Sequence, residues 1–186
     1  RDMVDVITRQ TDDLRRIVDE FSKFARMPEL RRKNEDLNAL VSSAVSFQQA
    51  GQPNVLINLS QPNFPLIISI DPTLINQALT NILKNAGEAI ETRMQSSSTS
   101  DHDGFIDVLV EDGSESVVIK ISDNGIGLPE DRSRLFEPYV TTRDKGTGLG
   151  LAIVKKIIEE HGGILKLEDS APFENTGIIG ALISIE

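Results

Sequence analysis

The sequence predicts an α+β protein, a two-layer sandwich of helices packed on a sheet, preceded by one long helix. Helical patterns and alternating strands are mixed without strict strand–helix alternation, which favours a sandwich over a parallel α/β fold. The first 27 residues contain no Gly or Pro and repeat apolar residues at helical spacing. The chain has 186 residues, 39% of them hydrophobic, which allows one full domain with an appendage.

Residues 1–27 are expected to form a single long helix that ends at Pro28. Its apolar positions alternate steps of four and three residues, the heptad period of helical bundles. A second apolar row widens the stripe, which favours one helix of a four-helix bundle assembled between chains. The alternative is an amphipathic helix packed on its own domain. The seam comprises Met3, Ile7, Gln10, Leu14, Ile17, Phe21 and Phe24, and the second row Val4, Thr11, Val18 and Ala25.

The charge changes sign along the chain and marks a domain boundary. Residues 1–33 hold nine Lys or Arg and seven Asp or Glu, a net charge of +2, although the whole chain carries −10. We therefore expect the long helix over 1–28, a linker over 29–35 and a second domain over 36–186. The acidic total argues against a nucleic-acid partner, because nucleic-acid binders usually present a basic surface.

The composition also limits the chemistry. Cysteine is absent, which excludes disulfides, a thiolate nucleophile and Cys-ligated metal sites. No apolar run approaches the roughly 20 residues that a membrane helix needs, and no signal peptide opens the chain. We expect a cytoplasmic fragment that does not itself span a membrane. The chain begins in the middle of a helical pattern, so we expect it to be cut from a longer protein.

The elements of the second domain follow from periodicity and from residues that stop helices and strands. Asp71-Pro72 combines an N-cap with Pro at the first helical position, and Gly162-Gly163 predicts a helix end. Asp112-Gly113 predicts a turn between two alternating strands, and the Ser-rich segment 96–104 predicts a loop. The expected helices are 36–49, 72–93 and 149–161, and the expected strands are 55–60, 66–70, 106–110, 117–121, 164–168 and 178–185.

A polar row runs along the helix expected over 72–93. Asn81 and Asn85 lie one turn apart on this row, although Asn is a poor residue for a helix interior. Their amide oxygens suit a hard cation such as Mg²⁺, which takes oxygen ligands and keeps several waters. Taken by themselves, these two residues are better explained by a solvated polar face.

A glycine-containing turn follows the strand expected over 117–121. It reads Asp123-Asn124-Gly125-Ile126-Gly127, in which two glycines permit positive φ and close approach of a ligand. A carboxylate at a strand end can accept a hydrogen bond from an exocyclic amine. The alternative is a plain turn closed by the Asp side chain.

A second glycine-rich segment opens the helix expected over 149–161. Gly146, Gly148 and Gly150 alternate with Thr147 and Leu149, so backbone N–H groups are exposed at a helix N-terminus. Such a terminus attracts phosphate, and Lys145 just before it adds positive charge. The segment is not a Walker loop, because the G-x-x-x-x-G-K-[ST] spacing is absent. The alternative is a glycine-rich hinge.

Together these segments resemble the N, G1, F and G2 boxes of histidine-kinase catalytic domains, which share the Bergerat ATP-binding fold with gyrase, Hsp90 and MutL. The matching runs begin at Asn81, Asp123, Phe136 and Gly146, in the family's order. The resemblance covers about 34–186. Residues 1–27 resemble the second helix of the dimerisation and phosphotransfer bundle, and 18–28 resemble nitrogen-regulation sensor kinases of the NtrY type.

The resemblance implies ATP and Mg²⁺ as ligands. Asn85 would ligate Mg²⁺ with Asn81 beside it, and Ala89 would face the adenine. Asp123 would read the adenine amine, while Gly125 and Gly127 would let the base approach. Residues 128–145 would form a lid over ATP, with Thr142 near the nucleotide. The phosphates would be held by Lys145, Gly146, Thr147, Gly148, Leu149 and Gly150.

The chain departs from the family pattern at two places. The family often carries Thr after the glycine of its last strand, but Gly180 is followed by Ala181, which puts that hydroxyl contact in doubt. The phosphoacceptor box is also missing. The chain has two histidines. Neither His102 in a polar loop nor His161 at a helix end has the context of an acceptor. We expect the acceptor on a helix before Arg1, and no catalytic residue in this fragment.

The resemblance implies a sensor kinase that transfers the γ-phosphate of ATP to a histidine and then to an aspartate of a response regulator, NtrX-like in this case. It also implies a homodimer formed through the bundle helix, and a membrane-anchored whole protein. One alternative is an ATP hydrolase of the gyrase, Hsp90 or MutL type. Those relatives carry a Glu base where this chain has Asn81, and an amide cannot take up the proton. Another is a nucleotide-sensing or dimerising module without transfer activity.

Overall fold

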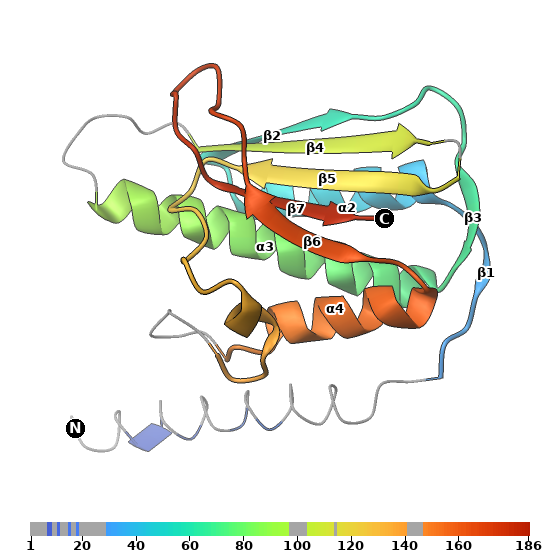
Figure 1. The fold of residues 1–186 in the computed structure, drawn as a ribbon, viewed down its shortest axis with the longest axis horizontal. Helices are drawn as coiled ribbons and strands as arrows, with labels where there is room; N and C mark the ends of the chain where they lie inside the picture. Colours follow the sequence, from blue (N-terminus) through green and yellow to red (C-terminus); the bar gives the residue numbers. More distant parts are fainter. Residues whose placement is uncertain are drawn as a thin grey trace.

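The computed structural model describes residues 7, 8, 11, 15, 18, 29–96, 104–113, 115–140 and 147–186. Most of the domain expected over 36–186 is therefore visible. A layer of helices covers one face of a β-sheet (Figure 1). This is the two-layer α+β sandwich that the sequence predicts.

The main sheet has five strands in the order β2-β4-β5-β7-β6. The pair β2–β4 is parallel, while β4–β5, β5–β7 and β6–β7 are antiparallel. The strands alternate buried and exposed residues because one face packs on the helices and the other faces solvent. Their bounds are Val55–Ser60 for β2, Gly104–Asp112 for β4, Val117–Asp123 for β5, Leu165–Asp169 for β6 and Ala181–Ile185 for β7.

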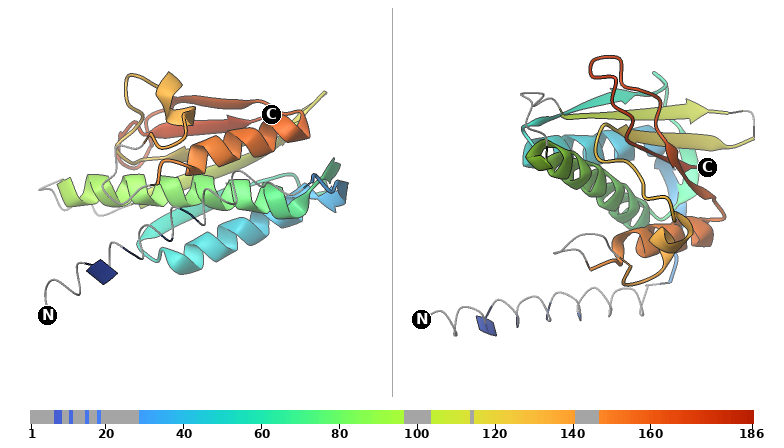
Figure 2. Two further views of the ribbon diagram at one scale, coloured as in Figure 1. Left: turned by 90° about the horizontal axis from the view of Figure 1, so that it is seen from below. Right: turned by 60° about the vertical axis from the view of Figure 1, so that its left-hand side comes forward.

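The helix layer consists of α2 (Leu37–Gly51), α3 (Pro72–Ser96) and α4 (Gly150–His161). The three helices lie side by side, with α3 packed between α2 and α4 (Figure 2). Each begins close to where the sequence predicts it. Asp36 caps α2 by accepting a hydrogen bond from the backbone N–H of Asn38, and α4 ends at the left-handed Gly162.

The core lies between the sheet and the helices. Large side chains that are completely or almost completely enclosed come from all three helices and from the inner face of the sheet, including Val41, Leu79, Ile82, Ile106, Ile121 and Ile157. Helix α3 has buried residues along nearly its whole length, which explains the broad apolar face in its sequence. This burial fixes α3 against both neighbours and so determines where its polar row points.

A short two-stranded sheet, β1 (Lys33–Asp36) with β3 (Ile67–Ile70), was not fully expected. The pairing is antiparallel, with Lys33 opposite Ile70 and Asp36 opposite Ile67. The linker expected over 29–35 therefore contains residues of β1, and the ordered domain starts before residue 36. A polar segment such as this shows no strand periodicity, because only its long-range partner makes it a strand.

The last predicted strand was too long at its start. Residues 178–180 precede β7, which begins at Ala181. Gly180 instead exchanges hydrogen bonds with Ser170: its N–H donates to the Ser170 hydroxyl at 2.8 Å, and its carbonyl accepts from the Ser170 N–H at 3.1 Å. These contacts hold the two ends of the β6–β7 connection together.

The helix expected over 1–28 lies mostly outside the described residues, as does most of the loop expected over 96–104. The five described positions before residue 29 are helical, and Ile7 and Val18 among them are exposed. Within the described part of the chain, no helix is both long and apolar enough to cross a membrane.

Candidate nucleotide-binding site

Helix α3 carries the polar row at the centre of the candidate site. Asn81 and Asn85 are half-buried, and Ala89, one turn further on, is 8% exposed. The N-terminus of α4 lies beside this row: a Cβ atom built on Gly150 would be 3.7 Å from Nδ2 of Asn85. The structure therefore brings together the Asn row and the glycine-rich segment, which are far apart in sequence.

The turn after β5 lies against the same face of α3. Asp123 is only 4% exposed, and its Oδ1 accepts a hydrogen bond from the Gly125 N–H at 2.8 Å. This is the Asp-closed turn that the sequence allows. A Cβ atom on Gly125 would lie 2.7 Å from Cβ of Ala89, so only glycine lets the turn approach the helix this closely. The close approach of this turn to Ala89 is thus compatible with the adenine contacts that the resemblance implies.

Asn124 holds this turn in place, and the sequence did not single it out. Its side chain is fully buried, and its Oδ1 accepts from the Phe105 N–H at 2.9 Å, while its own N–H donates to the Phe105 carbonyl at 3.2 Å. These bonds tie the end of β5 to the start of β4. The sequence does show a polar residue directly after an alternating strand, which could have indicated a structural role for Asn124. Only the pairing of β5 with β4 shows that its partner is Phe105.

The segment before β7 forms the other side of the turn. A Cβ atom on Gly180 would be 2.0 Å from the carbonyl oxygen of Asp123, so this position also requires glycine. The Ala181 N–H lies 3.5 Å from Oδ1 of Asp123, at the outer limit of a hydrogen bond. Gly127 has φ = 75° and faces the backbone of 179–180. The methyl group of Ala181 stands where the family often has a hydroxyl.

Helix α4 begins without a side-chain cap. Its N-cap residue is Leu149, which makes no capping hydrogen bond and has a fully buried side chain. By contrast, α2 and α3 begin with Asp36 and Asp71, whose carboxylates accept from the first turn. The first N–H groups of a helix have no intrahelical partner. Those of α4 receive no capping hydrogen bond from the side chain of Leu149, and this helix end lies beside Asn85.

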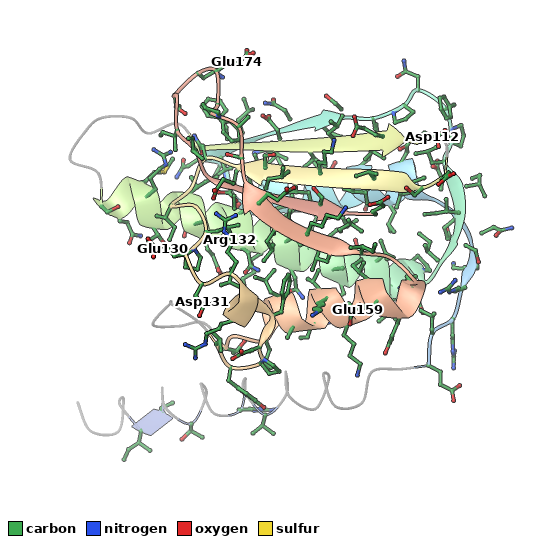
Figure 3. The ribbon with its side chains drawn as sticks, in the orientation of Figure 1. Asp112, Glu130, Asp131, Arg132, Glu159 and Glu174 are labelled. Carbon is green, nitrogen blue, oxygen red and sulfur yellow. The ribbon has the colours of Figure 1, made fainter. Side chains whose placement is uncertain are left out.

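The described part of the segment between β5 and α4 contacts β6, the glycine-rich segment and α4. Arg132 extends towards the end of β6, where one of its terminal nitrogens donates to both carboxylate oxygens of Asp169 at 2.7 Å (Figure 3). Tyr139 has φ = 68°, and its N–H donates to the Gly148 carbonyl at 3.2 Å. The ammonium group of Lys155 lies 5.0 Å from the ring centre of Phe136.

These contacts place the described part of the expected lid against α4 and the glycine-rich segment. Gly148 has φ = 68°, and a Cβ atom there would lie 2.6 Å from the backbone of Tyr139, so the contact again depends on glycine. Of the predicted phosphate-side residues, Gly150 lies beside Asn85 and Gly148 lies against Tyr139, while Thr147 and Leu149 belong to the same described stretch. Thr142, Lys145 and Gly146 lie outside the described residues.

The donor set fits a nucleotide phosphate chain with a hard cation. Asn85 offers an amide oxygen, and the uncapped end of α4 offers N–H donors. Within the described residues, no group of three or more His, Cys, Asp or Glu residues is arranged to hold a metal ion.

His161 has a structural place at the far end of α4. Its Nε2 accepts from the Asp71 N–H at 3.0 Å, and its Nδ1 lies 2.7 Å from the Ile157 carbonyl. This arrangement requires a neutral ring that carries its proton on Nδ1. His102 lies outside the described residues.

Comparisons with known proteins identify the family to which this fold belongs. A family model described as histidine kinase-, DNA gyrase B- and HSP90-like ATPase matches residues 70–180. The nitrogen regulation protein NtrY of Azorhizobium caulinodans is 48% identical over 167 residues, which are 89% of this chain and 21% of the relative. A putative NtrY-like sensor histidine kinase of Rickettsia bellii is 36% identical, over 97% of this chain and 27% of the relative.

Solved structures show the same fold. A nucleotide-free form of the catalytic domain of histidine kinase ThkA superimposes with a TM-score of 0.67 at 28% identity, covering 83% of this chain and 95% of that one. The predicted resemblance to histidine-kinase catalytic domains is thereby confirmed, including the likeness to the NtrY type. Since the family model matches well over half of the residues, this chain belongs to the histidine kinase-, DNA gyrase B- and HSP90-like ATPase family.

Proposed function

We propose that this chain is the ATP-binding catalytic part of a sensor histidine kinase. The whole protein would transfer the γ-phosphate of ATP to a histidine outside this fragment, and from there to an aspartate of a response regulator. The observation that carries the proposal is the meeting of three features: the uncapped N-terminus of α4, the amide of Asn85 and the buried carboxylate of Asp123. The relatives are named nitrogen regulation protein NtrY and putative NtrY-like sensor histidine kinase, and this chain spans 21% and 27% of their lengths.

Each feature would contact a different part of the nucleotide. Asp123 would accept a hydrogen bond from the adenine amine, with Ala89, Gly125 and Gly127 against the base. The N–H groups from Thr147 to Gly150 would hold phosphate oxygens. Bound Mg²⁺ would neutralise phosphate charge, and Asn85 with Asn81 beside it would orient it. Thr142, Lys145 and Gly146 would complete the phosphate side of the site.

Phosphotransfer is favoured over hydrolysis because of Asn81. A hydrolase needs a general base to activate water, and an amide side chain cannot accept that proton. Transfer to a histidine instead depends on placing the γ-phosphate in line with the acceptor nitrogen. The catalytic domain would therefore supply binding and orientation, while the acceptor comes from another helix.

The assembly and the partner are part of the same proposal. Residues 1–28 would form the second helix of a homodimeric phosphotransfer bundle. The exposure of Ile7 (59%) and Val18 (58%) supports this, because two members of the apolar stripe have little cover from the chain itself. The domain that follows would be the catalytic unit. The response regulator would be NtrX-like, and the whole kinase membrane-anchored with this part in the cytoplasm.

The test is a calorimetric titration followed by a transfer assay in trans. The chain should bind Mg-ATP but should not retain radiolabel from γ-labelled ATP. Addition of a folded bundle fragment carrying an acceptor histidine should yield acid-labile label on that fragment. No binding of any adenine nucleotide would overturn the proposal as a whole. Binding without transfer to a folded acceptor would favour the nucleotide-sensing alternative.

A further inference from the structure

Asp71 lies where three separate parts of the chain meet. It precedes α3, it touches the C-terminal end of α4, and it contacts the segment that enters the domain before β1. Its side chain is 6% exposed. A carboxylate this deeply buried requires hydrogen-bond partners, and here they come from distant parts of the sequence.

The two carboxylate oxygens bind different partners. Oδ1 accepts from the N–H groups of Thr73 at 3.0 Å and Leu74 at 3.2 Å, which caps α3. Oδ2 accepts from the Arg31 N–H at 2.9 Å. One oxygen therefore serves the helix and the other holds the entering chain, so a single substitution can separate the two functions.

The backbone of Asp71 adds the connection to α4. Its N–H donates to Nε2 of His161, and the next contact of the entering chain reaches the same helix: a terminal nitrogen of Arg32 donates to the Glu160 carbonyl at 3.0 Å. The segment 31–32 is thus tied to the start of α3 and to the end of α4. These are the two helices that carry Asn85 and the phosphate-side glycines.

Packing accounts for only part of the attachment of residues 31–32 to α3 and α4. Leu30 is half-buried against the core. On the other side, His161 lines a cavity of about 260 Å³ whose walls are mostly apolar, including Leu37, Ile75 and Ile158. Because close packing is incomplete beside the junction, its direction depends on hydrogen bonds, namely those of Asp71, the Arg32–Glu160 bond and the β1–β3 pairing.

We propose that Asp71 is a positioning residue that fixes the direction in which the chain enters the nucleotide-binding domain. The hydrogen bond from the Arg31 N–H to Oδ2, here called the clamp, fixes the orientation of the preceding helix relative to α3 and α4. The inference rests on the proposed function, in which that helix belongs to the bundle that receives the phosphoryl group. The clamp would limit the orientations between ATP and the acceptor, which matters because in-line transfer depends on geometry.

The test uses substitutions that remove the clamp and leave the helix cap. Asp71→Asn keeps one oxygen acceptor for the helix cap, because Asn caps helices about as well as Asp. It replaces the oxygen that accepts from Arg31 with an NH₂ group, which cannot accept that hydrogen bond. Arg31→Pro removes the donor itself, and Arg31→Ala is the matched control because it keeps the backbone N–H. Since the chain has no cysteine, spin labels can be placed on Arg15→Cys and Asp112→Cys.

In the labelled full chain, Asp71→Asn and Arg31→Pro should each broaden the distance distribution between the two labels, while Arg31→Ala should leave it unchanged. Amide exchange at Arg31 should accelerate roughly tenfold or more in Asp71→Asn, with little change at Thr73 and Leu74. The double variant should broaden the distribution no further than either single variant, because both remove the same contact.

Unchanged distributions in both clamp variants, with faster exchange at Arg31, would overturn the inference. Accelerated exchange at Thr73 would show that the amide had rotated and the cap was lost, and the Arg31→Pro result would then decide. Mg-ATP affinity should stay within about twofold of the unaltered chain in every variant, as Asp71 is remote from the site residues. Failure of the unaltered chain to bind ATP would instead contradict the proposed function.

Discussion

Asn124 and Phe105 are joined by a reciprocal pair of hydrogen bonds across the ends of β5 and β4. The Phe105 N–H donates to Oδ1 of Asn124 at 2.9 Å, and the Asn124 N–H donates to the Phe105 carbonyl at 3.2 Å. This side chain is buried directly beside Asp123. The position of Asp123, which we propose reads the adenine, therefore depends on a neighbour that would not itself touch the nucleotide.

Asn124→Ala should destabilise the domain by about 1–3 kcal/mol, because the Phe105 N–H loses its buried acceptor. It should also weaken ATP binding through displacement of the turn. Urea unfolding and calorimetric titration measure the two effects. Asn58→Ala is the matched control, since the Asn58 side chain donates to Asp107 at an exposed position and should cost under about 0.5 kcal/mol. Equal effects of the two substitutions would contradict this account.

Gly125→Ala should reduce ATP affinity at least tenfold. The new methyl group would lie 2.7 Å from Cβ of Ala89 and 2.8 Å from its backbone, and the helix backbone cannot yield as a flexible side chain can. Gly51→Ala is the control, because a Cβ atom at Gly51 has no neighbour within 4 Å. It should leave affinity unchanged. Normal binding by Gly125→Ala would show that the turn need not approach α3 closely.

Asn85→Ala should lose the Mg²⁺-dependent part of ATP binding, on the order of tenfold, and keep the part measured in excess chelator. The reason is that Asn85 would contact the cation and not the base. Lys84→Ala is a suitable control, because this neighbouring side chain is 64% exposed and pairs with Glu88. Titrations with and without Mg²⁺ check the prediction, and an equal loss under both conditions would refute it.

The stabilising contribution of Asp71 should depend on pH at the acidic end. Burial alone would raise the pKa of its carboxyl, but hydrogen bonds from the backbone N–H groups of Arg31, Leu74 and Thr73 outweigh this and hold the pKa below its usual value. A lowered folded-state pKa means stability that is present above about pH 4 and is lost as the pH falls through the folded-state pKa. Asp71→Asn lacks this contribution.

Urea unfolding at pH 7 should therefore find Asp71→Asn less stable than the unaltered chain by about 1 kcal/mol. The difference should shrink as the pH falls through the folded-state pKa of Asp71, where the carboxyl takes up its proton. A difference that stays constant over this range would mean that the charge of Asp71 contributes nothing.

Truncation should separate assembly from nucleotide binding, and the structure sets where to cut. A chain starting at residue 29 keeps β1 and the Arg31 contact, and should be a monomer that binds ATP. One starting at residue 34 loses the Lys33 pairing and the Arg31–Asp71 hydrogen bond, and should be less stable. The full chain should form concentration-dependent oligomers in light scattering, and a monomeric full chain at high concentration would argue against the bundle helix.

The sequence by itself determined where most of the helices and strands lie and which residues form the candidate site. Helix starts at Asp36 and Asp71, the end of α4 at Gly162 and the strand alternation of β4 and β5 all follow from interactions within a few residues. For the same reason the glycine-rich segments and the Asn row could be recognised in order along the chain. Spacing over a few residues can be read from the sequence alone, so the fold class was predictable and a candidate nucleotide site could be located.

Only the tertiary structure decided which distant groups meet. The strand β1 exists because Lys33–Asp36 finds β3, and the Asp71 contacts join residues 40 and 90 positions apart. The buried partner of Asn124 and the contact between Gly180 and Asp123 likewise depend on strand order. Such contacts form when the apolar faces of α3, α4 and the sheet pack together. Because this packing depends on the whole chain, local sequence patterns do not predict it.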